Sequence, residues 1–219
     1  MQKVWKYLCI AGMVGAVGYL LHVVIGGALW PGYNHLMQPI SDLTGSGAHD
    51  LAIENTILLF YGPPCIVFGF AAMMYLRGFA PRITQTGMLL YFLMQLVSIM
   101  YNFFPQDVPG ITTFPGTMHL VITFAIIPLT ILAPILLGIG IRKVEGFRGF
   151  GKYSIISGII LFIAGGTTAM FFANGLPYFG LVERINIGTL QLWTFITAYK
   201  FVTIDTSALP KWNGDAKKG

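Results

Sequence analysis

Long apolar segments alternate with short polar stretches along the whole chain. Six of these segments are long enough to cross a bilayer as helices, because a hydrocarbon core of about 30 Å requires roughly 20 helical residues. They cover residues 7–29, 54–76, 83–104, 118–141, 153–173 and 184–204. Neither a linker nor a shift in composition divides them. The pattern predicts an all-α, polytopic membrane protein: a single domain over residues 1–219, built as a bundle of six transmembrane helices with a short polar tail at 205–219.

The composition supports a lipid environment. The chain of 219 residues is 55% hydrophobic and only 10% charged, whereas about a quarter of the residues in a soluble domain are charged. The net charge of +5 does not indicate nucleic acid binding, because the basic residues lie in short breaks between apolar segments and form no cluster. We therefore expect membrane lipids, and no nucleic acid, as partners. Nothing in the composition indicates an oligomeric state.

The N-terminus has features of a signal peptide, because Lys3 and Lys6 precede an apolar run. That run, residues 7–29, is longer than the roughly 7–15 residues of a signal-peptide core. We interpret it as a retained first helix, with cleavage as the alternative. The two cysteines, Cys9 and Cys65, lie in apolar segments without metal or redox spacing, which favours inert packing residues.

The basic residues predict an orientation. Twelve of the thirteen Lys and Arg residues fall on one side of the predicted helices, and only Arg184 falls on the other. The twelve are Lys3, Lys6, Arg77, Arg82, Arg142, Lys143, Arg148, Lys152, Lys200, Lys211, Lys217 and Lys218. Because Lys and Arg collect in cytoplasmic loops, both termini are expected in the cytoplasm of a cell-membrane protein. Most of the acidic residues then face outward.

One outer loop carries the most distinctive polar stretch, Gln38 to Thr44. Pro39 suits the first position of a short helix, where its missing N–H has no cost. We expect this helix to lie on the membrane surface with Ile40 and Leu43 pointing inward. The other outer loops, 104–117 and 174–183, contain prolines and glycines that specify bent paths.

Polar residues also follow helical spacing inside the apolar segments. The segment 83–104 carries Tyr91, Gln95, Ser98 and Asn102, and the segment 184–204 together with the residue before it carries Glu183, Asn186 and Trp193. Polar groups are costly in lipid, so these stripes are expected to face the bundle interior. Two interpretations stay open: the stripes line a cavity that is open to the outside, or they supply hydrogen bonds between helices. His22, some five residues inside the first helix, is interpreted as structural.

From these patterns we predict one polar site at the outer boundary. Its candidate catalytic residues are Asp42, Asp107, His119 and Glu183, because carboxylates and imidazole serve acid–base chemistry. Its candidate ligand-binding residues are Ser41, Gln38, Gln95, Asn102, Arg184 and Asn186. Ser41 is also a conceivable nucleophile with His119 as its base. No metal-ligand spacing and no hydrolase motif is found, so no metal site is predicted and no cofactor is indicated.

Four short motifs resemble a prokaryotic membrane family catalogued as domain of unknown function 998. They are Pro-Ile-Ser-Asp-Leu at 39–43, Phe-Pro-x-Asp at 104–107, Gly-x-x-His at 116–119, and Gly-Leu-x-Glu-Arg at 180–184 followed by Trp193. The resemblance covers residues 7–204 and implies a six-helix fold with an outer-facing site, but no established activity. The family is also distantly similar to the Frag/DRAM/Sfk type of six-helix proteins, some of which are linked to lipid remodelling.

Three functional hypotheses follow. The first is a membrane enzyme that modifies a lipid or lipid-linked headgroup. The second is a non-catalytic protein that binds a lipid headgroup or a small polar ligand, or serves as an accessory subunit. The third is a structural protein whose outer polar residues tie loops to helix ends. Convergence of the candidate residues with free lone pairs favours the first two, and closed, fully paired contacts favour the third.

Overall fold

The computed structural model describes residues 2–205 and 209; most of the predicted tail lies outside the described residues. In this part of the chain helices hold 76% of the residues and no strand is present, so the all-α prediction is confirmed. The α-helices are α1 (Gln2–Leu8), α2 (Ile10–Leu29), α3 (Leu51–Leu58), α4 (Gly62–Leu76), α5 (Arg82–Ser98), α6 (Phe114–Ile141), α7 (Arg148–Ala173) and α8 (Phe179–Thr203). Two 3-10 helices, η1 (Ile40–Thr44) and η2 (Ile99–Asn102), complete the set.

Five helical stretches in the described residues are long and apolar enough to cross a membrane. They are Gln2–Leu29, Leu51–Leu76, Arg82–Asn102, Phe114–Ile141 and Arg148–Ala173. The sixth predicted span corresponds to α8, which has 25 residues but carries more polar groups. A membrane-type helical bundle is therefore established, while the count of six spans stays a prediction.

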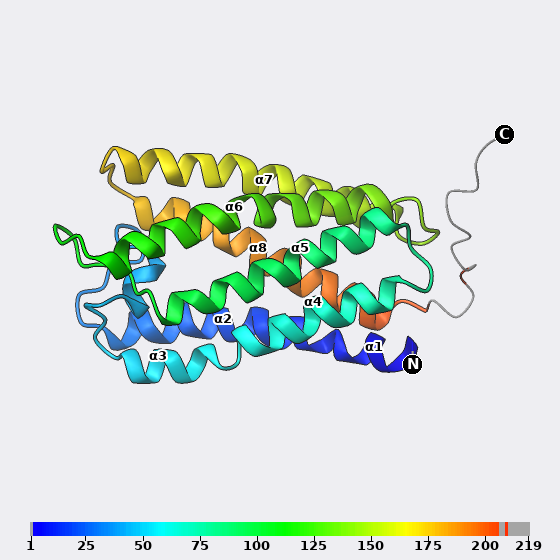
Figure 1. Cartoon of the computed structure of the whole chain (residues 1–219), viewed down its shortest axis with the longest axis horizontal. Helices are drawn as coiled ribbons and strands as arrows, with labels where there is room; N and C mark the ends of the chain where they lie inside the picture. Colours follow the sequence, from blue (N-terminus) through cyan, green and yellow to red (C-terminus); the bar gives the residue numbers. More distant parts are fainter. Residues whose placement is uncertain (1, 206–208, 210–219) are drawn as a thin grey trace.

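The helices form a ring of antiparallel neighbours (Figure 1). From α4 onward each helix packs against the next, and α8 returns to pack against α2, which in turn contacts α4. The long loops 30–50, 103–113 and 174–178 gather at one end of the bundle, called here the loop end. The N-terminus and the turns 77–81 and 142–147 lie at the opposite end, called the turn end.

Small residues bring the helices close together. Glycines of α2 face bulky partners on neighbouring helices: Gly12 meets Phe68, and Gly15 meets Cys65. Large side chains of α4, α5 and α8 contribute to a hydrophobic core that includes Trp193. The Trp193 indole donates to Ser154 Oγ at 2.7 Å, and that hydroxyl donates to the carbonyl of Pro134 at 2.7 Å. These glycines and Ser154 therefore serve the packing of helix on helix.

The predicted helix 54–76 is divided in two. Helix α3 ends at Leu58, and α4 begins at Gly62 with proline in its first turn. Proline lacks an N–H that the first turn leaves unpaired anyway, so it starts a helix at low cost. The two prolines therefore open a new helix after a break at 59–61, and the prediction of one continuous helix over 54–76 is wrong. In α6, by contrast, the helix continues through both Pro128 and Pro134.

Candidate functional site

The loop 30–50 folds over the loop end and is organised by its own hydrogen bonds. The Tyr33 hydroxyl donates to the carbonyl of Pro39 at 2.6 Å, and Asn34 Oδ1 accepts from the backbone N–H of Leu36 at 2.9 Å. Pro39 precedes η1, whose Ile40 and Leu43 side chains are 4% and 1% exposed. The prediction of a short helix with two inward apolar residues is confirmed.

Gln106 joins this loop to the loop 103–113. Its Nε2 donates to Asp42 Oδ1 at 2.8 Å, and its Oε1 accepts from the Ser41 hydroxyl. The backbone N–H of Ser46 donates to the Gln106 carbonyl at 2.8 Å. Sequence reasoning missed Gln106, although it fills the variable position of the Phe-Pro-x-Asp motif between two singled-out residues.

Burial determines the electrostatics of Asp42. Loss of solvent raises the pKa of its carboxyl group above the ordinary value of 3.8, and hydrogen bonds from the side chains of Gln106 and Gln38 offset part of that rise. Both neighbours are neutral amides. Asp42 is thus a partly buried carboxylate that has no cationic partner within residues 2–205.

Asp107 and His119 arrange the entry to α6. The Asp107 carboxylate accepts from the Thr113 N–H at 2.7 Å and from the Thr113 hydroxyl at 2.6 Å. Gly116 faces this carboxylate so closely that a Cβ atom would collide with it. His119 Nδ1 lies 3.0 Å from the carbonyl of Phe104, and its ring lies 4.5 Å from that of Tyr101. Asp107 thus holds the end of the loop 103–113 from within that loop, and His119 faces the same loop from α6.

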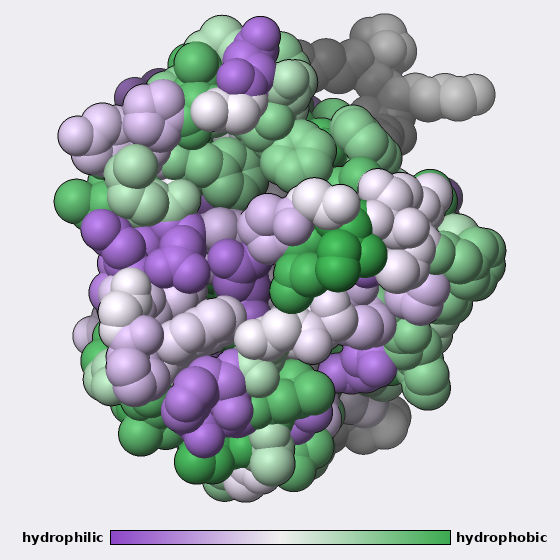
Figure 2. Space-filling view, turned by 90° about the vertical axis from the view of Figure 1, so that its left-hand side faces the viewer, coloured by the Kyte–Doolittle hydropathy of each residue, from purple (hydrophilic) through white to green (hydrophobic). Residues whose placement is uncertain are grey.

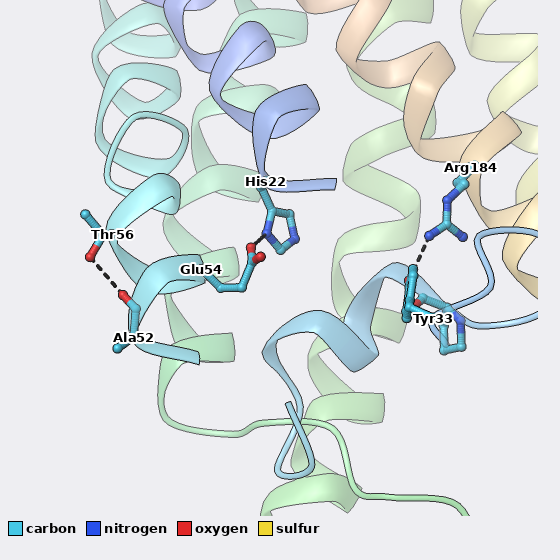
Figure 3. Close-up of polar contacts among 7 residues, drawn as sticks. His22, Tyr33, Ala52, Glu54, Thr56 and Arg184 are labelled. Carbon is cyan, nitrogen blue, oxygen red and sulfur yellow. Dashed lines mark hydrogen bonds and ion pairs between the residues drawn. The ribbon is translucent and has the colours of Figure 1, made fainter. Parts of the chain in front are cut away.

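Glu183 and Arg184 lie in the first turns of α8 and hold the loop 30–50 from the other side. Glu183 Oε2 accepts from the backbone N–H of Ile40 at 2.6 Å. Arg184 Nη1 donates to the carbonyls of Gln38 at 2.8 Å and Gly180 at 3.0 Å. Its Nη2 donates to the Tyr33 hydroxyl at 2.7 Å and lies 3.2 Å from His35 Nδ1 (Figure 3).

The groups that accept hydrogen bonds from Arg184 are neutral. Burial raises the pKa of Tyr33 to about 12, in spite of its bond to Arg184, so the phenol stays protonated. Burial and the Arg184 charge both lower the pKa of His35, which leaves an uncharged imidazole facing the guanidinium. Among the described residues no carboxylate lies within 4.0 Å of Arg184, and its buried Nε has no hydrogen-bond partner. The guanidinium therefore has neutral hydrogen-bond acceptors, and the adjacent Glu183 carboxylate is bonded to the Ile40 N–H instead.

The other candidates lie along the helices. Gln95 is 4% exposed; its Nε2 donates to the Tyr91 hydroxyl at 3.0 Å, and its Oε1 accepts from Tyr61 at 3.4 Å. Asn186 Oδ1 is buried without a partner. Asn102 is exposed and donates to the carbonyl of Ile99 in its own turn. The stripe therefore enters the interior at Gln95, whereas Asn102 lies at its exposed end.

The candidates form linked groups rather than a catalytic constellation. Ser41 donates to Gln106, and His119 faces a backbone carbonyl, so the two do not form a nucleophile–base pair. No group of three or more His, Cys, Asp or Glu side chains within the described ranges could hold a metal ion. The shared feature of these contacts is that three separate segments are tied together at the loop end.

A buried pair was not recognised as such from the sequence. His22 Nδ1 of α2 is hydrogen-bonded to Glu54 Oε2 of α3, with side chains only 3% and 2% exposed (Figure 3). Glu54 was expected at the start of a helix at the boundary, but α3 begins at Leu51 and carries it inward. The available signal was the face of α2 on which Tyr19, His22 and Gly26 follow each other at helical spacing.

Seen from the loop end, hydrophilic residues concentrate on this face between hydrophobic patches (Figure 2). A family model described as protein of unknown function, DUF998, matches residues 13–200. No curated protein and no solved structure matches the chain. With the match extending from α2 almost to the end of α8, the chain belongs to the DUF998 family.

Proposed function

We propose that this membrane protein binds a phosphate-bearing headgroup at Arg184, without catalysing a reaction, on the extracytoplasmic side of a cell membrane. The observation that carries the proposal is the charge of Arg184, which has no carboxylate within 4.0 Å among the described residues. A planar guanidinium matches the oxygens of phosphate with two parallel N–H donors.

The nearby carboxylates support this assignment, because each has another partner. Asp42 is bonded to Gln106, Asp107 to Thr113, and Glu183 to the Ile40 N–H. Asp50 is paired with His49, and Glu54 with His22. None of them is available as a close counter-ion for Arg184 without giving up a bond that it already makes.

The distribution of basic residues supports an outer location. The described Lys and Arg residues other than Arg184 lie at the turn end or within a few residues of it. If that end is cytoplasmic, as the positive-inside rule predicts, Arg184 is the one cation that headgroups of the outer leaflet can meet. The neighbours of Arg184, Tyr33 and His35, are only partly buried. Rearrangement of loop 30–50 can therefore expose the guanidinium of Arg184 to a headgroup.

Binding is favoured over headgroup modification by the contacts of the candidate acids. Acid–base catalysis needs a carboxyl or imidazole group within reach of the reacting atoms. Asp107 and His119 instead hold backbone and side-chain groups of the loop that leads into α6. The lipid-binding experiment described next also tests the enzyme hypothesis, because a chemically modified lipid would be detected by its mass.

The test measures lipid binding by native mass spectrometry of the purified full-length protein. The lipids are phosphatidylglycerol and a phosphate-free glycolipid, and inorganic phosphate is added as a competitor. We expect retention of phosphatidylglycerol and at least about tenfold weaker binding for Arg184→Gln, because a hydrogen bond to a charged group contributes about 1.5–3 kcal/mol. Competition by inorganic phosphate would identify the phosphate group itself, rather than the lipid, as the ligand.

Matched variants separate binding from folding. Lys143→Gln removes an exposed positive charge at the turn end and should leave binding unchanged. Tyr33→Phe removes one acceptor of Arg184 and should preserve or strengthen binding, because Nη2 is then free to donate to phosphate. If folded Arg184→Gln binds phosphatidylglycerol as tightly as wild type does, the proposal is contradicted. If the mass of the bound lipid changes, the protein modifies the lipid and the enzyme hypothesis is supported instead.

A further inference from the structure

The interior of the bundle contains one ionisable pair that the proposed headgroup site does not use. His22 and Glu54 lie within two of the candidate membrane spans, Gln2–Leu29 and Leu51–Leu76. Both side chains are at least 97% buried. Ionisable groups at such positions are costly and are usually associated with function.

Charge determines how many protons the pair can hold at low cost. A neutral imidazole beside a carboxylate carries one negative charge in total. When two protons are added, the pair carries one positive charge. Only the state with a single proton is neutral, and a buried net charge is strongly unfavourable. The pair is therefore expected to retain one proton.

The unpartnered oxygen of Glu54 indicates which of the two side chains holds that proton. Oε2 is bonded to His22 Nδ1, whereas Oε1 is buried and has no hydrogen-bond partner. An ionised carboxylate with an unsatisfied oxygen costs much more than a neutral carboxylic acid with an unsatisfied carbonyl. This difference favours a proton on Oε2 of Glu54, from which it can be donated to Nδ1 of a neutral imidazole.

A second imidazole–carboxylate pair lies one helical turn nearer the surface. His49 Nδ1 is 2.6 Å from Asp50 Oδ2, and these side chains are 52% and 32% exposed. Asp50 precedes Glu54 by four residues, and its carbonyl accepts the Glu54 N–H at 3.1 Å. Four residues of helix advance by about 6 Å along its axis. The solvated pair therefore lies at the start of the helix that carries Glu54.

We propose that His22 and Glu54 form an intramembrane binding site for one proton, which exchanges with solvent by way of the His49–Asp50 pair. In the resting state the proton is on Glu54. When it moves to His22 Nδ1, an imidazolium and a carboxylate form, and the net charge stays at zero. A proton lost from the pair is replaced from hydronium at the loop end, so protons and charge balance.

In the described part of the chain, the elements packed around the pair supply no hydrogen-bonded competitor for this proton. Other titratable or charged groups on these elements near the loop end are Tyr19 of α2, Tyr61 at the α3–α4 break, Asp42 of η1, and Glu183 and Arg184 of α8. Tyr19 contacts the His22 ring edge-on at 5.5 Å. No hydrogen bond joins any of these five side chains to the side chain of His22 or Glu54 in residues 2–205. Gly26 faces Glu54 so closely that a Cβ atom would collide with its carboxyl group, which allows α2 and α3 to enclose the pair.

Infrared difference spectroscopy of the full chain in lipid bilayers tests this proposal. Wild type should show a C=O band of protonated carboxyl groups at neutral pH, and Glu54→Gln should lose the part of this band that belongs to Glu54. The glutamine amide can still donate to His22 Nδ1, so that variant keeps a bond in the pair and is expected to fold. Glu145→Gln, at an exposed position in the turn 142–147, is the control and should leave the band unchanged.

Exchange with deuterium oxide tests access. The Glu54 band should shift in wild type, and Asp50→Asn should slow that shift without removing the band. A missing band, or a band that does not shift in deuterium oxide, would overturn the proposal. An unchanged exchange rate in Asp50→Asn would overturn the proposed route.

Discussion

Arg184 Nη1 donates to the carbonyl of Gln38 at 2.8 Å, across 146 positions of the chain. This bond joins the start of α8 to the loop that follows α2. The adjacent Glu183 binds the N–H of Ile40 in the same loop at 2.6 Å. Two consecutive residues thus hold opposite sides of one short segment, Gln38 to Ile40.

Arg184→Lys is predicted to loosen this segment. An ammonium group keeps the charge but cannot donate in two directions from a planar fork. Loss of one or two of the four Arg184 contacts should lower stability by about 2 kcal/mol, on the scale of hydrogen bonds to charged groups. Hydrogen exchange in detergent should rise in residues 33–45 and stay unchanged in α7. If the exchange rate rises equally in all parts of the chain, the contacts of Arg184 do not stabilise this segment locally.

Sequence patterns predicted the fold better than the site. Hydrophobic runs reveal a membrane helix because every backbone polar group must be satisfied inside lipid, which leaves the helix as the main solution. The η1 helix was also predictable, since Pro39 and the spacing of Ile40 and Leu43 are local signals. These features depend on neighbours within a few residues.

Contacts between distant residues had no such signal. Gln106 binds Asp42 from 64 positions away, and Glu54 meets His22 from 32 positions away. A glutamine in a loop and a glutamate near a helix start look like ordinary surface residues. Only the packing of α3 on α2 and of one loop on another determines their partners. The break between α3 and α4 was missed because continuous hydrophobicity masked the turn before Pro63.

Gly116→Ala is predicted to destabilise the start of α6. A Cβ atom there would collide with the Asp107 carboxylate, which holds Thr113. Forced repacking of this kind costs about 1–3 kcal/mol. Gly166→Ala in α7 is the matched control: a Cβ atom there meets nothing within 4 Å, and alanine is the better helix former by up to about 1 kcal/mol. Thermal unfolding should show a lower midpoint for the first variant and an equal or higher one for the second.

Asp42 is predicted to make stability depend on pH. Burial raises its folded-state pKa above the ordinary value of 3.8, so the protonated form is favoured by folding. That contribution is complete below the unfolded pKa and is lost as the pH rises through the folded pKa. Asp42→Asn retains the acceptor for Gln106 without the buried charge, so it should be more stable than wild type at neutral pH. The difference should vanish below about pH 3.8.

The measurement for this prediction is the unfolding midpoint of both proteins from neutral to acidic pH. Asp50→Asn serves as a comparison, because Asp50 is paired with an imidazole rather than with amides. If wild type and Asp42→Asn keep a constant difference at all pH values, the carboxylate of Asp42 is not the titrating group.

Cysteine accessibility in intact cells tests the central claim most directly, because an outer headgroup site requires the loop end to face outward. The two native cysteines, Cys9 and Cys65, are fully buried and should not react. Thr112→Cys places a thiol at an exposed position of the loop end, and Lys143→Cys places one at the turn end. The account predicts that a membrane-impermeant maleimide labels Thr112→Cys in intact cells and labels Lys143→Cys only after lysis. The reverse pattern would contradict it, because Arg184 and the whole polar face would then lie in the cytoplasm.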